Sequence, residues 1–166
     1  MARARSPCHD KRRPFASTQP HAYNPGMRCP VCRSEPLVVL EYGGVEVDYC
    51  PQCRGVWLDA GELELLFEDA AACAAFLSIG SPVTVPRGER RRRCPICDQR
   101  MDKEATRGPN AVVFDHCPYG DGIWFDHGEL ATVLQYADAL DDAGETSATD
   151  AVRAYLREVF AAEAIE

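Results

Sequence analysis

Six cysteines form three short-spaced pairs along the chain, a seventh follows the third pair, and pairs of this kind are typical of metal sites. A Cys-x-x-Cys turn offers two thiolates, so two turns complete the four-ligand tetrahedron that zinc prefers. Seventeen residues separate the first two pairs, within the range for paired zinc knuckles. We therefore predict two structural zinc ions rather than buried reduced cysteines or redox-active pairs. The assigned cysteines are Cys29, Cys32, Cys50 and Cys53 in site one, and Cys94, Cys97 and Cys117 in site two.

Site two lacks a fourth cysteine. Gly120 stands in its place and offers no side chain. We expect Asp121, one residue further on, to supply the fourth ligand, because carboxylate oxygen also binds zinc. His116, His127 and a water molecule are alternatives, and a degenerate, empty second site is another.

Composition limits the setting and the partners. The chain has 166 residues, nine cysteines and a net charge of −8. An odd cysteine count cannot be fully paired as disulfides, and the sequence has neither a signal peptide nor an apolar run of roughly 20 residues. We expect a cytoplasmic protein with no membrane contact. Cys73, in the segment AAACAAF, is expected to be a buried, inert thiol.

The cysteines repeat because the surrounding segment repeats. Residues 27–67 align with residues 92–134 over the cysteines, a Gly-x-Trp-x-Asp segment and a following Gly-Glu-Leu. Two residues inserted between the knuckles of the second copy reconcile the alignment. The segments 37–41 and 45–49 flank Gly-Gly, which predicts a hairpin that brings the first two knuckles together. In the second copy, residues 111–115 predict a strand.

A helix is expected after each second knuckle. Asp59 with Glu62, and Asp126 with Glu129, have the spacing of a capping box, in which each side chain reaches the backbone amide of the other residue. Apolar residues follow at helical spacing through residue 77 in the first copy.

These elements predict a small α+β fold in five parts. A third, amphipathic helix is predicted over 150–165. The predicted parts are a disordered basic tail (1–26), repeat one with its helix (27–80), an Arg- and Pro-rich linker (81–92), repeat two with its helix (93–144) and a C-terminal helix segment (145–166).

Two features invite a nucleic-acid interpretation. Trp57 and Trp124 have ring faces on which bases can stack, but we expect each ring to pack between knuckle and helix and to shield the zinc from water. The run Arg90, Arg91, Arg92 and Arg93 has the charge to contact phosphates, but the domains on either side of it are acidic.

The pattern Cys-Pro-x-Cys, hairpin, Cys-Pro-x-Cys-x-Gly-x-Trp-Leu-Asp-x-Gly-Glu-Leu resembles the transcription factor IIB-type zinc-finger family, a short zinc-ribbon module. The first copy, residues 29–66, matches throughout, and the second, residues 94–134, matches except at Gly120. The resemblance implies tandem zinc ribbons with zinc at the matched cysteines. A Gly followed by His or Asp resembles a recurring variant of the module, which supports Asp121. The family name does not imply transcription, because it records the likeness of one small module.

The sequence is compatible with three functions. The leading hypothesis is a non-catalytic zinc protein that docks a protein partner, with the C-terminal helix as the contact. The alternative is a nucleic-acid-binding regulator that uses the basic tail and the linker arginines. The least favoured is a zinc hydrolase with water at site two and Glu129 or His127 as base. His127-Gly128-Glu129 has the His-x-Glu spacing, but no Pro-Cys-x-x-Cys follows it as the signature of zinc deaminases requires, and the sequence offers no separate substrate domain.

Overall fold

The computed structural model describes residues 26–67, 70–77, 91–106, 111–140 and 148–161. The predicted tail and most of the linker lie outside these ranges. Within them, no helix has the length and apolar character needed to cross a membrane. The elements are β1 (Val38–Tyr42), β2 (Val45–Tyr49), β3 (Val56–Asp59), α1 (Glu62–Leu65), α2 (Ala70–Leu77), β4 (Asp102–Ala105), β5 (Val113–His116), β6 (Gly122–Phe125), α3 (Glu129–Leu140) and α4 (Ala148–Phe160).

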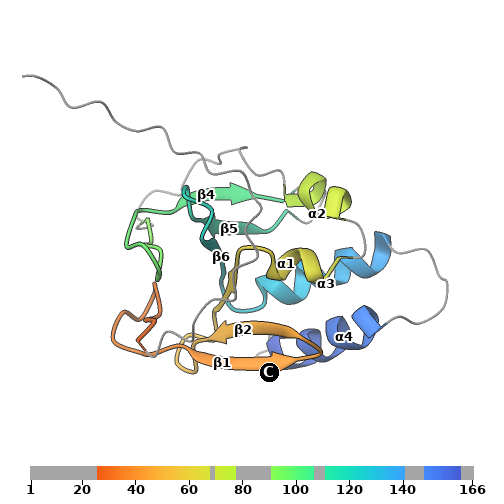
Figure 1. Ribbon diagram of the computed structural model, residues 1–166, viewed down its shortest axis with the longest axis horizontal. Helices are drawn as coiled ribbons and strands as arrows, with labels where there is room; N and C mark the ends of the chain where they lie inside the picture. The colour runs from red at the N-terminus through yellow and green to blue at the C-terminus, as the bar shows by residue number, and fades with distance from the viewer. Residues whose placement is uncertain (1–25, 68–69, 78–90, 107–110, 141–147, 162–166) are drawn as a thin grey trace, which may run out of the picture.

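The two repeats share one antiparallel sheet with the strand order β1-β2-β3-β6-β5-β4 (Figure 1). The repeats join where β3 pairs with β6, and Trp57 lies directly opposite Trp124. Because these two residues are equivalent in the repeats, the pairing relates the copies by an approximate two-fold axis through the tryptophan pair. The predicted part boundaries remain a prediction, but the sheet itself is continuous across both repeats.

The two faces of the central strands have different roles, as expected from the alternation of side chains along a strand. Val56 and Leu58 of β3, with Ile123 and Phe125 of β6, face a core that includes residues of all four helices. Trp57 and Trp124 point to the opposite face, where they cluster with buried cysteines and Met101. The sheet therefore separates a helix-covered core from a cysteine-rich one.

The predicted hairpin is confirmed to within one residue. Strands β1 and β2 pair in register around Gly43 and Gly44, whose φ angles of 63° and 82° suit glycine at a two-residue turn. The predicted strand at 111–115 is β5, displaced to Val113–His116. Strands β3, β4 and β6 were missed, because a four-residue strand gives too few residues for a periodic pattern.

The prediction of one continuous helix after Asp59 is wrong. The segment is split into α1 and α2, and the amides of Leu66 and Phe67 donate to carbonyls three residues back. The carbonyl of Leu66 accepts a hydrogen bond of 3.1 Å from Arg153 of α4. This long-range bond uses the carbonyl that a continuing helix would have paired with the amide four residues on.

Helix α4, predicted over 150–165, runs from Ala148 to Phe160 and packs on this chain itself. Its Tyr155 ring stacks on Tyr42 of β1 with centroids 4.2 Å apart, and Phe160 lies 5.4 Å from Tyr49 of β2. Val152 and Leu156 are buried in the core. The helix therefore buries Val152 and Leu156 against this chain, while Tyr155 and Val159 are 40% and 43% exposed. The expectation that the helix contacts a partner stays a prediction.

A reciprocal contact between a glycine and a tryptophan holds the repeats together. A Cβ atom added to Gly55 would overlap the Trp124 ring, and one added to Gly122 would overlap both the Trp57 ring and the Leu58 carbonyl. In each Gly-x-Trp segment, the tryptophan ring packs on the glycine of the other repeat, and the glycine leaves room for the other repeat's ring. The contact explains the glycine of the repeated motif by close packing between the copies.

We expect Gly55→Ala and Gly122→Ala each to lower the free energy of unfolding by about 1–3 kcal/mol, the usual cost of overpacking a core. The loss should be larger at Gly122, because a backbone carbonyl cannot move aside as a side chain can. Urea denaturation measures both variants. Gly44→Ala is the steric control, because no atom lies within 4 Å of its added Cβ; it carries only the cost of its positive φ. If the Gly55 and Gly122 variants were no less stable than this control, the packing explanation would be wrong.

Candidate metal centres

Site one brings together the four cysteines predicted for it. Their sulfur atoms all lie within 4.8 Å of one another. The closest pairs join the two knuckles: Cys29 to Cys53 at 3.5 Å and Cys32 to Cys50 at 3.9 Å. The amides of Val31 and Cys32 point at the Cys29 sulfur from 3.4 and 3.3 Å. These amides favour a thiolate over a thiol.

The spacing fits zinc. Four sulfurs at the usual Zn–S distance of about 2.3 Å lie about 3.8 Å apart in a tetrahedron. The measured separations of 3.5 and 3.9 Å lie on either side of that value. They also exceed the S–S bond length of about 2.0 Å, so the cysteines are free thiols and not disulfides.

Site two brings together Cys94, Cys97, Cys117 and Asp121, the set predicted from sequence. The Cys97 and Cys117 sulfurs are 3.6 Å apart. The Asp121 Oδ2 atom lies 3.4 Å from the Cys94 sulfur and 3.2 Å from the Cys117 sulfur. A zinc-bound oxygen and sulfur lie about 3.5 Å apart in a tetrahedron, so the three thiolates and the carboxylate fit the ion.

The histidine alternatives for site two lie elsewhere. His116 Nδ1 is 3.6 Å from the Glu104 carboxylate on β4, and His127 is exposed. Neither histidine belongs to a group of potential metal ligands in the described part of the chain.

Without metal, three of the four thiols of site one hold their protons, whereas hydrogen bonds lower the pKa of Cys50 despite its burial. Burial raises the pKa of Cys29 to about 12, against the opposing effect of two amide hydrogen bonds. Burial raises the pKa of both Cys32 and Cys53 to about 11. Zinc binding must therefore displace protons, which makes metal uptake pH-dependent. Cys73 is fully buried outside both sites, which confirms the prediction of a buried thiol, and burial raises its pKa to about 12, as suits an unreactive one.

The two tryptophans pack against the cysteines, as predicted. The helix that was expected on the other side of each ring is replaced by the other repeat. Both rings are fully buried, which excludes base stacking in this fold. Each ring packs on the other repeat rather than on its own helix. The Trp57 and Trp124 indole N–H groups donate to Asp59 and Asp126 at 2.5 and 3.1 Å.

The predicted capping boxes are half formed. Glu62 accepts the Asp59 amide at 2.8 Å, and Glu129 accepts the Asp126 amide at 2.6 Å. The predicted second bond, from the Glu62 amide to the Asp59 side chain, does not cap α1, because the N-cap residue of α1 is Gly61. Asp59 is instead the last residue of β3, where its carboxylate satisfies a buried indole.

Burial raises the pKa of the Glu62 carboxyl to about 8, opposed by the Asp59 amide and reinforced by the Asp59, Asp48 and Glu46 carboxylates. Glu129 is raised less, to about 7, because Lys103 and Arg92 partly offset its burial. The folded state therefore binds these protons more tightly than the unfolded chain does. Each contribution to stability is complete below about pH 4.5 and is lost as the pH rises through the folded pKa.

We expect Glu62→Gln to raise the free energy of unfolding at pH 8.5 by about 1 kcal/mol, after allowance for partial exposure. The gain should shrink as the pH is lowered to 6.5, because the wild-type carboxyl becomes protonated. The Glu129→Gln gain should be smaller. Urea denaturation of the zinc-loaded chain across this range, with exposed Glu41→Gln as control, measures the effect. A gain that grew toward low pH would contradict the assigned direction.

Arg91, Arg92 and Arg93 each contact a carboxylate or a carbonyl of this chain. Arg92 lies 3.0 Å from Asp115 and 2.6 Å from Asp126, and it is largely buried. Arg91 pairs with Asp102 at 3.1 Å, and Arg93 donates to the Asp98 carbonyl at 2.7 Å. Lys103 is buried 3.1 Å from Asp115. Arg90 lies outside the described residues, so three of the four predicted phosphate contacts have carboxylate or carbonyl partners within this chain.

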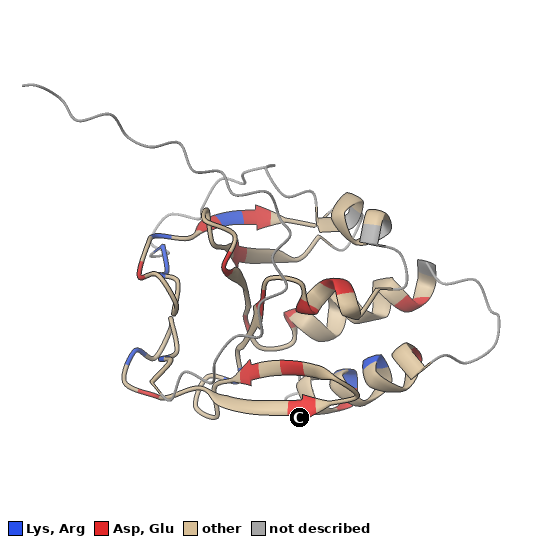
Figure 2. Cartoon of the chain, viewed as in Figure 1, with Lys and Arg blue, Asp and Glu red and all other residues tan. Residues whose placement is uncertain are grey.

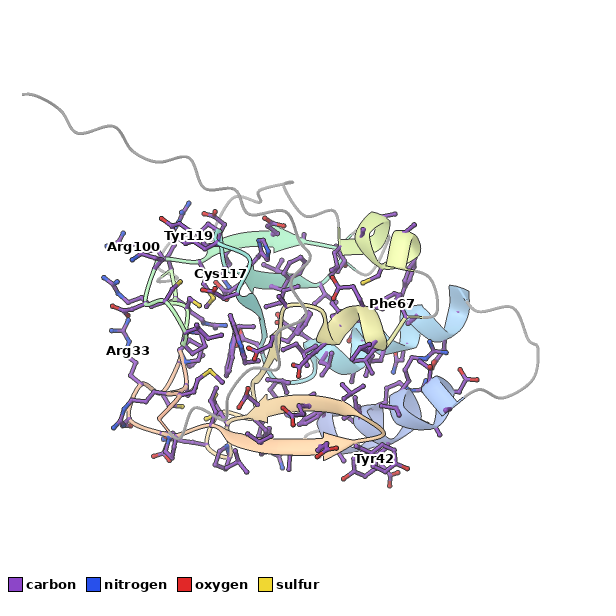
Figure 3. The ribbon with its side chains drawn as sticks, viewed as in Figure 1. Arg33, Tyr42, Phe67, Arg100, Cys117 and Tyr119 are labelled. Carbon is purple, nitrogen blue, oxygen red and sulfur yellow. The ribbon has the colours of Figure 1, made fainter. Side chains whose placement is uncertain are left out.

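The tips of the knuckle turns form one exposed edge of the molecule. We call the side chains of Val31, Arg33, Ile96, Arg100 and Tyr119 the knuckle edge. Figure 3 shows the labelled members Arg33, Arg100 and Tyr119 along the same end of the molecule as Cys117. Figure 2 shows basic residues in both loops at this end, beside some acidic ones, and further basic residues on β4 and α4. No local sequence pattern indicates that these residues lie together.

Comparison with known proteins gives one family. The profile of the transcription factor zinc-finger family matches residues 28–69 and 93–136, which is about half of the chain. Its two segments coincide with the two repeats and include every cysteine of both sites. Neither the curated proteins nor the solved structures gave a match.

Proposed function

The chain belongs to the transcription factor zinc-finger family of zinc ribbons, and from that premise we propose that it is a non-catalytic protein that docks a protein partner through its knuckle edge. In this proposal zinc has a structural role: it neutralises buried thiolates and fixes the knuckle turns. The proposed ligands are Cys29, Cys32, Cys50 and Cys53 at site one, and Cys94, Cys97, Cys117 and Asp121 at site two.

The observation that carries the proposal is the exposure of apolar side chains at the knuckle tips. Val31 and Ile96 occupy the same place in the first knuckle turn of each repeat, and each is 40% exposed. Tyr119, in the fourth turn, is 61% exposed. Exposed aliphatic and aromatic side chains beside arginine are the composition found at the centres of protein interfaces. A zinc-fixed turn presents them at little entropic cost.

The charges at this edge suit a protein partner that carries acidic groups. Arg33 and Arg100 are exposed, and neither has an ion-pair partner within the described ranges. Two such arginines supply charge for specific contacts but fall short of the many phosphate contacts that dominate nucleic-acid affinity. Protein docking is favoured over the nucleic-acid alternative for this reason.

The enzyme alternative receives no support from site two. An open catalytic zinc keeps its fourth position for water or substrate. Here the Asp121 carboxylate lies at the distance of a fourth ligand from both the Cys94 and Cys117 sulfurs.

The test replaces the apolar tips together, as Val31→Ser, Ile96→Ser and Tyr119→Ser, in the zinc-loaded full chain. A matched control replaces apolar residues exposed on helices, Leu65→Ser and Val159→Ser, which are 56% and 43% exposed. We expect the knuckle variant to lose at least about tenfold in affinity for any partner recovered with the wild type, and the control to keep it. Calorimetry with the purified partner measures both affinities.

A partner that bound all three proteins equally would overturn the proposal. Labelled DNA and RNA are tested in parallel at low salt. Binding that weakened steeply with salt and was reduced by Arg33→Glu would instead support the nucleic-acid alternative.

A further inference from the structure

The fourth knuckle turn is built differently from the other three. In the first three, the residue directly after the second cysteine has a positive φ: Arg33 at 62°, Arg54 at 61° and Asp98 at 57°. In the fourth, the positive φ of 77° belongs to Gly120, one position earlier relative to the repeat. The Gly120 amide donates to the Cys117 carbonyl at 2.9 Å, which closes the turn one residue sooner. The side chain of Asp121, rather than that of residue 120, therefore turns toward the three sulfurs.

This change places a hard oxygen donor among soft sulfur donors. The Asp121 Oδ2 atom lies 3.2 Å from the Cys117 sulfur and 3.4 Å from the Cys94 sulfur, while site one has the Cys53 sulfur in the corresponding role. Thiolate is the stronger ligand for zinc in a sulfur-rich site. Replacing the carboxylate by a thiolate would reproduce the donor set that the same fold already holds at site one.

The turn that carries Asp121 is open to solvent. No atom lies within 4 Å of a Cβ placed on Gly120, and the neighbouring Tyr119 is 61% exposed. Asp121 is itself partly exposed, whereas Cys94 and Cys117 are buried. A small molecule or an extended protein segment can therefore approach the fourth position without entering the core.

We propose that site two accepts an external thiolate in place of the Asp121 carboxylate. With zinc bound by Cys94, Cys97 and Cys117, the incoming sulfur would replace the Asp121 carboxylate oxygen as the fourth ligand, and the thiol proton would pass to water. No atom changes oxidation state, and the three cysteines keep the metal in place. The ligand class is an accessible thiol, whether of a small molecule or of a cysteine in a partner. The inference rests on the zinc ribbon and not on docking at the knuckle edge.

The experiment uses the full chain with cobalt(II) in both sites, because thiolate-to-cobalt charge-transfer absorption reports the number of bound sulfurs. 2-Mercaptoethanol is titrated into the wild type and into Asp121→Cys. We expect the wild-type spectrum to change in a saturable way toward that of Asp121→Cys, which should itself stay unchanged. Native mass spectrometry should find two metal ions throughout. Asp98→Ala, which alters an acidic residue of another knuckle, should titrate as the wild type does.

Three results would overturn the proposal: an unchanged wild-type spectrum, an equal response from Asp121→Cys, or loss of metal from site two as thiol is added. Asp121→Ala keeps the test decisive should Asp121→Cys fail to load metal. Without a competing carboxylate it should bind the thiol at about tenfold lower concentration than the wild type. A wild-type response to thiol supports this inference even if the knuckle-edge variants dock normally. Loss of docking in those variants supports the proposed function even if site two does not respond to thiol.

Discussion

Removal of zinc should unfold this protein, with loss of essentially all of its free energy of unfolding. Structural zinc sites contribute about 10–16 kcal/mol of apparent binding energy, whereas small domains are stable by about 5–15 kcal/mol in total. The cysteine-rich side of the sheet has little else to hold it. Its core consists of Cys29, Cys50, Cys94 and Cys117 with Met101 and the two tryptophans.

The same core connects the two sites to the junction of the repeats. Trp57 and Trp124 pack against the cysteines and also face each other across β3 and β6. Once the metal leaves, the thiols take up protons and the knuckle turns lose the cation that closes them. The junction then loses one of its two supporting layers, so both repeats should unfold together.

The measurement is tryptophan fluorescence and far-ultraviolet circular dichroism during treatment with a chelator, followed by return of zinc. Cys29→Ser should have a similar effect at site one, while Cys73→Ser, which alters a buried thiol outside both sites, should keep two zinc ions. A chain that kept its native spectra with no metal left would contradict the central role given to zinc.

Replacement of Arg153 by Met should cost about 3 kcal/mol of stability, near the lower end of the range for breaking a buried ion pair. The Arg153 side chain is completely buried. Its Nε lies 2.8 Å from Asp138 of α3, and its guanidinium donates to Asp150 of α4 and to the Leu66 carbonyl that ends α1. The side chain thus ties three helices together. The cost stays near the lower end because the two carboxylates are 29% and 35% exposed and regain water.

Arg157→Met is the matched control. Arg157 also pairs with Asp138, but its side chain is 35% exposed, so we expect a loss of about 0–1 kcal/mol. Urea denaturation of both zinc-loaded variants gives the comparison. Equal losses would show that burial of Arg153 does not decide its contribution.

Attachment of α4 by Arg153 also bears on how the molecule meets a partner. Most of the apolar side of this helix lies against the first repeat and α3, so we propose an encounter surface elsewhere. The knuckle edge is such a surface, and it lies at an end of the molecule whose loops carry basic residues. Changes at α4 should therefore act on stability, and changes at the knuckle edge on binding.

The metal chemistry followed from short-range patterns. A Cys-Pro-x-Cys turn fixes two thiolates within one turn of the backbone, so residue spacing alone was enough to group the ligands of site one. The structure also groups Asp121 with the three cysteines of site two, and its role as the fourth ligand stays a prediction. The hairpin at Gly43 and Gly44 followed from the conformational freedom of glycine in a tight turn.

Only the tertiary structure showed that the repeats form one sheet. Pairing of β3 with β6 depends on contacts between residues 67 positions apart, Trp57 and Trp124, and no local pattern encodes such a partner. The break after α1 was hidden for the same reason, since the Leu66 carbonyl is taken by Arg153, 87 residues away. Local sequence determined the metal sites because their ligands lie within short turns. The packing of the repeats and helices was decided by side chains that meet only after folding.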